Sequence, residues 1–115
     1  MSHKALHQFC RSLPHVTEDV KWGADLVFSV GGKMFAAFDA KGEPGYGFKT
    51  TPANFAMLTK QDGIIPAPYA ARFFWVSVVE PKALPLAAAK ELIAESYQLV
   101  AAKLPRGVRR KLGME

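Results

Sequence analysis

The sequence predicts a single α+β domain in which helices cover one face of an antiparallel sheet. Its length of 115 residues corresponds to one domain. Half of the residues are apolar, which is enough for a core without disulfide bonds. The expected elements follow the order helix, three strands, helix, strand, helix. This order is typical of an antiparallel sheet with its helices on one side.

The first predicted helix covers residues 3–13. Apolar side chains recur there at spacings of three and four, at Leu6, Phe9, Cys10 and Leu13. Pro14 ends this helix, because the residue before a proline avoids helical backbone angles.

Three strands are predicted next. Residues 26–30 alternate between the two faces of a sheet, and residues 33–38 form the partner strand. Gly31-Gly32 between them predicts a hairpin, because primed turns need positive φ angles. Residues 39–44 form a second turn. The third strand, 45–49, places Tyr46 and Phe48 on one face and Lys49 on the other.

A short second helix is predicted to begin after Thr51, which suits the N-cap position, with a proline at the first helical position. This helix would direct Phe55 and Leu58 inward and stop before Asp62. The proline-rich residues 65–69 are expected to be irregular.

The last strand and the longest helix follow. Residues 73–79 are apolar on both faces, which predicts a central strand or one covered on both sides. Residues 86–104 carry the helical stripe Leu86, Ala89, Ile93, Tyr97, Val100 and Leu104. We expect residues 1–104 to form the domain and residues 105–115 to form a basic tail, of which residues 108–115 are mobile.

Charge is unevenly distributed along the chain. The net charge is +5, of which residues 1–102 contribute +1 and residues 103–115 contribute +4. The lone Cys10 excludes an internal disulfide and a four-thiolate zinc site, and indicates a reducing compartment. No signal peptide or membrane-spanning run is evident, so we expect a cytoplasmic protein without a membrane partner, and a monomer.

Several short phrases, in this order and spacing, resemble the MmcQ/YjbR family over about residues 6–104. They are Leu13-Pro14, Glu18, Trp22-Gly23, Phe28, Gly32-Lys33-Met34-Phe35-Ala36, Lys49, Pro52, Pro66-Ala67-Pro68-Tyr69, Trp75, Ser96-Tyr97 and Leu99-Val100. His15 departs from the pattern, which has a small residue there. The resemblance implies a fold like that of the frataxin homologue CyaY, with a twisted sheet, and DNA binding by hairpins in a double-wing arrangement.

The basic residues are the candidate DNA contacts, since each neutralised phosphate releases a counterion and makes binding sensitive to salt. Five lie in the tail: Lys103, Arg106, Arg109, Arg110 and Lys111. Four lie on or near the hairpins and strands: Lys33, Lys41, Lys49 and Arg72. The alternative is a solvated tail and ordinary exposed lysines. No arginine lies near the hairpin tips, so bidentate reading of guanine there is unsupported.

Other candidate sites have weaker support. The aromatic residues Trp22, Tyr46, Phe48 and Trp75 could stack on unpaired bases, but large aromatic side chains more often belong to the core, which is the interpretation we favour. His3, His7 and Cys10 share one helical face without an evident fourth ligand, unless His15 folds back, so no metal or other cofactor is expected. Residues 1–17 contain no acidic residue, which excludes frataxin-like iron binding. No catalytic motif occurs, and we expect a protein that is not an enzyme; the alternative is an enzyme whose active-site residues are scattered along the chain.

Two functional hypotheses remain. The first is DNA binding through phosphate contacts made by the tail and the hairpins. The second is a protein-interaction or small-ligand domain that uses the 66–69 loop and the sheet face that the helices leave uncovered. The two hypotheses differ in whether the basic residues converge on one surface or scatter.

Overall fold

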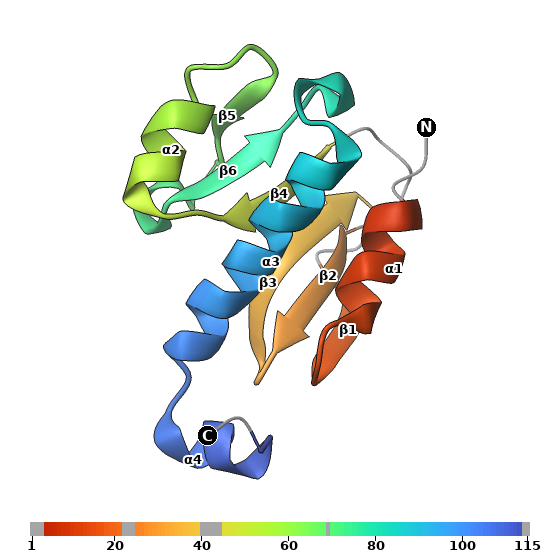
Figure 1. The fold of residues 1–115 in the computed structure, drawn as a ribbon, viewed down its shortest axis with the longest axis vertical. Coiled ribbons are helices and arrows are strands. Elements are labelled where there is room, and N and C mark those ends of the chain that lie inside the picture. Colours follow the sequence, from red (N-terminus) through yellow and green to blue (C-terminus); the bar gives the residue numbers. More distant parts are fainter. Residues whose placement is uncertain (1–3, 22–24, 40–44, 69, 114–115) are drawn as a thin grey trace.

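The computed structural model describes residues 4–21, 25–39, 45–68 and 70–113, and these form one antiparallel sheet with helices on one face (Figure 1). Within these ranges the strands are β1 (Val16–Lys21), β2 (Asp25–Val30), β3 (Lys33–Asp39), β4 (Tyr46–Lys49), β5 (Ile64–Pro66) and β6 (Trp75–Val78). The helices are α1 (Lys4–Ser12), α2 (Pro52–Leu58), α3 (Leu86–Ala102) and α4 (Arg106–Lys111), with 3-10 turns η1 (Ala71–Phe73) and η2 (Pro81–Ala83). The strand order is β1-β2-β3-β4-β6-β5, which confirms the predicted fold class.

The β2–β3 hairpin turns at the two glycines, as predicted. Gly31 has φ 58° and Gly32 has φ 81°, and Val30 pairs with Lys33. Both angles belong to a primed turn, whose twist matches that of the flanking strands. Beyond the turn the register shifts, because Phe28 pairs with Ala36 whereas Ser29 pairs with Met34. Phe35 is therefore the extra residue of a β-bulge.

The core lies between the sheet and helices α1 and α3. Residues that pair across neighbouring strands share a face, so one row of the sheet directs Phe38, Tyr46 and Val78 toward the helices. These side chains are buried. The bulge turns Phe35 to the same side, where its ring meets Tyr97 of α3 edge-on with 5.4 Å between the centroids.

Two strands were not predicted, and both lie at the edges of the sheet. β1 contains Thr17, Glu18 and Asp19, which are exposed, so its sequence lacks the apolar alternation that marks a strand. β5 lies in the segment expected to be irregular. An edge strand tolerates Pro66, because its missing N–H removes no inner ladder bond.

The predicted helices form with small differences in their bounds. Thr51 caps α2, since its Oγ1 accepts a hydrogen bond from the Asn54 N–H at 3.1 Å. Leu86 was predicted to face the core but is 49% exposed, because it lies in the first turn of α3, before the packed stripe begins at Ala89. No described helix has the length and apolar character that a membrane span requires.

Two further expectations were wrong. Phe73 was predicted to begin the last strand, but the strand begins at Trp75, because Phe74 adopts a left-handed conformation with φ 64° that interrupts extended backbone. Residues 108–115 were expected to be mobile, but residues 108–111 belong to α4. Val108 and Leu112, one helical turn apart, pack against the core and hold this helix in place.

Candidate functional site

Eight of the nine predicted basic residues lie on or beside segments that adjoin one another in turn, which are α4, the β2–β3 turn, the end of α3, β4 and η1. We call this set the basic end. They are Lys33, Lys49, Arg72, Lys103, Arg106, Arg109, Arg110 and Lys111. Lys41, the ninth, lies outside the described residues. In Figure 1, α4 lies beyond the lower end of α3, on the side where the β2–β3 hairpin turns.

Contacts between the turn and α4 bring the tail and the hairpin together. A Cβ placed on Gly31 would lie only 2.7 Å from Cδ1 of Leu104 and 3.1 Å from Cγ1 of Val108. The turn therefore rests directly on the segment that leads into α4. Because Lys33 follows this turn, the cations of α4 and of the hairpin lie on adjoining segments. Arg109 is half-buried there, and its Nε has no hydrogen-bond partner among the described residues.

Lys49 joins the sheet to this surface. Its Nζ donates a hydrogen bond to the carbonyl of Phe73 at 3.2 Å and lies 6.0 Å from the centroid of that ring. The guanidinium of Arg72 lies over the same ring at 4.7 Å. Burial, together with the positive charge of Lys103, holds the pKa of Lys49 below its ordinary value. Two cations, from β4 and η1, thus lie against an exposed aromatic ring, and Lys103 at the end of α3 lies close enough to Lys49 to act on its charge.

The backbone that presents this ring is held in an unusual conformation. Phe74 is left-handed, which costs a residue with a side chain about 1–2 kcal/mol. The N–H and Oγ1 of buried Thr50 both donate to the Phe74 carbonyl, at 2.8 and 2.7 Å. These bonds offset the strain and fix Phe73 where it is 49% exposed. Sequence reasoning missed Phe73, because an apolar run indicated a buried strand.

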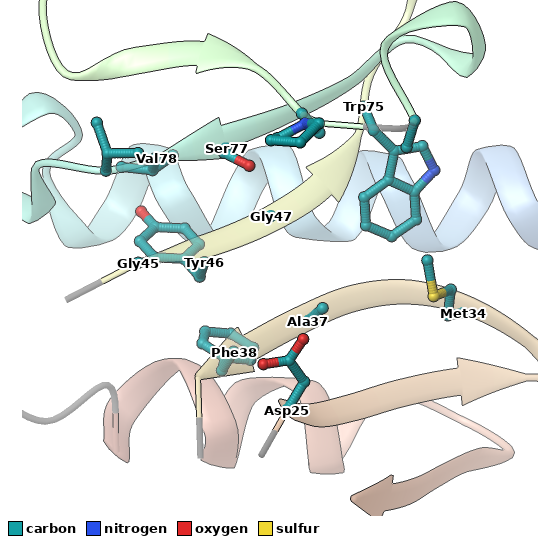
Figure 2. Close-up of a pocket in the computed structure, with 14 residues that line it drawn as sticks. Asp25, Met34, Ala37, Phe38, Gly45, Tyr46, Gly47, Trp75, Ser77 and Val78 are labelled. Atoms are coloured by element: carbon teal, nitrogen blue, oxygen red, sulfur yellow. The ribbon is translucent and has the colours of Figure 1, made fainter. Parts of the chain in front are cut away.

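A second feature lies on the sheet face that carries no helix, and we call it the open-face trough (Figure 2). Its volume is about 690 Å³, within the range of ligand pockets. The floor is a row of small residues, since Ala37 pairs with Gly47 and Gly47 pairs with Ser77. No large side chain from this row fills the space above β3, β4 and β6.

The walls of the trough are apolar and its two ends differ. Trp75, Met34 and Pro68 line it, and Figure 2 shows Trp75 and Met34 at one end. The Asp25 carboxylate lies toward the other end, beside Phe38. Trp75 pairs with Lys49, so the aromatic end of the trough adjoins the basic end. The second hypothesis named this loop and this uncovered face, although not the trough's floor or Asp25.

The predicted aromatic candidates divide between the two faces of the sheet. Tyr46 and Phe48 belong to the core, where Tyr46 stacks on Phe38 at 5.5 Å, as the core interpretation predicted. Trp75 is 8% exposed and contributes only part of its indole to the trough. Trp22 lies outside the described residues.

The histidine and cysteine candidates lie away from both features. His7 packs edge-on against Phe38 at 4.6 Å, and Cys10 is buried in the core. Burial raises the pKa of the Cys10 thiol to about 12, so the thiolate that binds metals is disfavoured. The described residues contain no cluster of three or more His, Cys, Asp or Glu side chains suited to a metal ion. His3 lies outside the described residues.

These features define a small α+β domain with a basic end and an apolar trough on its open sheet face. The family model YjbR matches residues 11–99, and the chain belongs to this family. The crystal structure of a Deinococcus radiodurans protein with a DUF419 domain is similar over 99% of this chain and 89% of that chain, with a TM-score of 0.83 and 27% identity.

A Pseudomonas syringae protein shares the fold at 22% identity, with a TM-score of 0.70 over 87% of this chain and 99% of that one. No curated protein matches the chain.

Proposed function

We propose that this protein binds DNA through phosphate contacts made by the basic end. The observation that carries the proposal is that the cations of α4, the hairpin, the end of α3, β4 and η1 lie on adjoining segments. Scattered lysines would have favoured an ordinary solvated surface. Binding of this kind depends on phosphate charge, so we expect weak sequence preference and a steep loss of affinity with salt.

The electrostatics of Lys49 support this proposal. Lys49, Arg72 and Lys103 form no salt bridge with a described carboxylate, and the charge of Lys103 acts unfavourably on Lys49. A phosphate near Lys49 and Lys103 would remove this repulsion and add charge-assisted hydrogen bonds. Arg72, with its planar guanidinium on Phe73, is suited to phosphate recognition as well.

A binding role fits the titratable groups better than a catalytic one. The pKa of Cys10 and that of Tyr46 are both raised to about 12 by burial, which keeps both groups protonated and unreactive at neutral pH. A monomer in the cytoplasm, where the buried thiol stays reduced, is the form that we propose.

The test is fluorescence anisotropy with labelled double-stranded DNA over a salt series. The variant Lys103→Glu/Arg106→Glu reverses two exposed charges of the basic end, and Lys60→Glu/Lys82→Glu makes the same change in net charge at exposed positions outside it. We expect the first pair to lower affinity by about tenfold or more and to reduce the salt dependence, since each lost phosphate contact lowers the slope by about one. Equal effects of both pairs would show that only net charge matters and would overturn the assigned surface.

A further inference from the structure

The open-face trough has opposite charge at its two ends. The Asp25 carboxylate lies at one end, and Lys49 adjoins Trp75 at the other. Between them the lining is mainly apolar, formed by Met34, Pro68 and the small floor residues. A ligand that matches this arrangement has an anionic group at one end, a flat apolar middle, and a hydrogen-bond donor at the other end.

The sheet register sets the length of this ligand. Asp25 and Lys49 are separated by two strand spacings across the sheet and four residues along it. At about 4.8 Å per strand and about 3.3 Å per residue, the two backbone positions lie roughly 16 Å apart. A single nucleotide is shorter than this, whereas a few successive nucleotides span it.

We propose that the trough receives unpaired bases of single-stranded DNA while the flanking phosphates contact Lys49 and Arg72. This inference rests on the proposed function and adds a preference for single strands. Bases are suited to the trough because they are flat and have apolar faces, and Phe73, which is 49% exposed beside Lys49, provides a surface for stacking where the strand leaves the trough. A duplex keeps its bases stacked and paired inside, so it reaches only the cations.

Asp25 adds a preference among the bases. A carboxylate accepts hydrogen bonds, and the exocyclic amino group of cytosine is a donor that acidic side chains recognise. Thymine has no exocyclic amino group. We therefore expect an oligomer of dC to bind more tightly than an oligomer of dT, and we expect the variant Asp25→Ala to remove this difference.

The experiment compares three probes with the full chain: oligo-dC of about 12 nucleotides, an abasic oligomer with the same number of phosphates, and a duplex. Ser77→Leu fills the floor of the trough from a partly exposed position. Thr17→Leu makes a similar change at an exposed position on β1, outside the trough, and serves as the matched control. Neither substitution changes a charge.

A second measurement does not depend on the filled variant. The chain has two tryptophans, so Trp22→Phe leaves Trp75 as the single indole whose fluorescence reports on the trough. We expect oligo-dC to change this fluorescence and the abasic oligomer to leave it unaltered. We also expect Ser77→Leu to weaken oligo-dC binding by about tenfold or more while the duplex binds as before.

Each outcome decides the inference. The inference is supported if Ser77→Leu weakens the binding of oligo-dC but not that of the duplex, and if oligo-dC changes the Trp75 fluorescence. Equal affinity for oligo-dC and the abasic oligomer, with unchanged fluorescence, overturns the trough site and leaves the phosphate contacts in place. Failure of all three probes to bind at low salt overturns both this inference and the proposed function.

Discussion

The Ser96 hydroxyl bridges the backbones of Lys49 and Phe35, at the point where the regular hydrogen bonds between β4 and β3 end. Its Oγ accepts a hydrogen bond from the Lys49 N–H at 3.0 Å and donates one to the Phe35 carbonyl at 2.7 Å. The paired residues of β3 and β4 run from Phe38↔Tyr46 to Ala36↔Phe48, and the bulge at Phe35 ends the regular ladder there. A fully buried serine on α3 therefore fixes the backbone at the point where Lys49 enters the basic end.

Ser96→Ala should destabilise the fold by about 1–3 kcal/mol, because it leaves a partly buried N–H and a buried C=O without their hydrogen bonds to Ser96. Urea unfolding measures this change. Ser12→Ala is the matched control, since its hydroxyl bonds the Phe9 carbonyl in an exposed position where water can replace it. Equal losses for the two variants would contradict the role that we assign to Ser96.

The two glycines of the β2–β3 turn allow a paired test of how α4 is held. Both have positive φ, so alanine is strained at either position by about 1–2 kcal/mol. A Cβ at Gly32 meets open space, whereas a Cβ at Gly31 would lie 2.7 Å from the Leu104 side chain. Gly31→Ala should therefore cost more than Gly32→Ala and should also loosen α4.

Hydrogen exchange of the α4 amides, together with urea unfolding, distinguishes these effects. We expect faster exchange in α4 for Gly31→Ala and unchanged exchange for Gly32→Ala. If both variants left α4 equally protected, the contact between the turn and Leu104 would not be what holds the helix.

Local signals predicted the elements that local chemistry determines. The Gly31-Gly32 hairpin and the Thr51 cap depend on residues adjacent in sequence, and both formed as predicted. The sequences of the edge strands β1 and β5 lack the apolar alternation that predicts a strand, because an edge strand is stabilised by its neighbour and keeps polar or proline residues. The conformation of Phe74 depends on Thr50, a contact between separate segments that no periodicity reveals.

The candidate site was predictable only as a set of charges. Counting lysines and arginines identified the residues of the basic end, but the contact of the hairpin turn with Leu104 and Val108, which brings the tail beside the hairpin, could not be read from the sequence. The trough required more, since Ala37, Gly47 and Ser77 are unremarkable singly and form a floor only in the observed register. A prediction of strand pairing could have found that row, because three small residues aligned across neighbouring strands leave a hollow.

Stability should fall at alkaline pH through two buried groups. The pKa of Cys10 rises from 9.0 to about 12 and that of Tyr46 from 10.0 to about 12, in both cases because burial disfavours the charged form. The folded state thus holds these protons more tightly than the unfolded chain, so their contribution is fully present below pH 9.0 and is lost as the pH rises toward about 12. Each unit of difference is worth about 1.4 kcal/mol.

Urea unfolding at a series of pH values measures this loss. The variant Cys10→Ala should be less stable at neutral pH, because it opens a cavity in the core, but its stability should fall less steeply above pH 9.0. The burial explanation would be wrong for Cys10 if the variant and the parent lost stability in parallel.

The effect of the Lys103 charge should be measurable as a change in the pKa of Lys49. Burial is the larger cause that lowers the pKa of Lys49, and Lys103 adds to it through like-charge repulsion. Lys103→Ala should therefore raise the pKa of Lys49 toward its ordinary value without restoring it fully, because the burial remains. Titration of the lysine Cε resonances by NMR follows this change directly, and Lys82→Ala, at an exposed position on η2, should leave Lys49 unaffected. Double-stranded DNA should raise the same pKa in the parent protein, since a phosphate beside Lys49 favours its charged form. If neither Lys103→Ala nor DNA changed the pKa of Lys49, this lysine would not belong to the basic end.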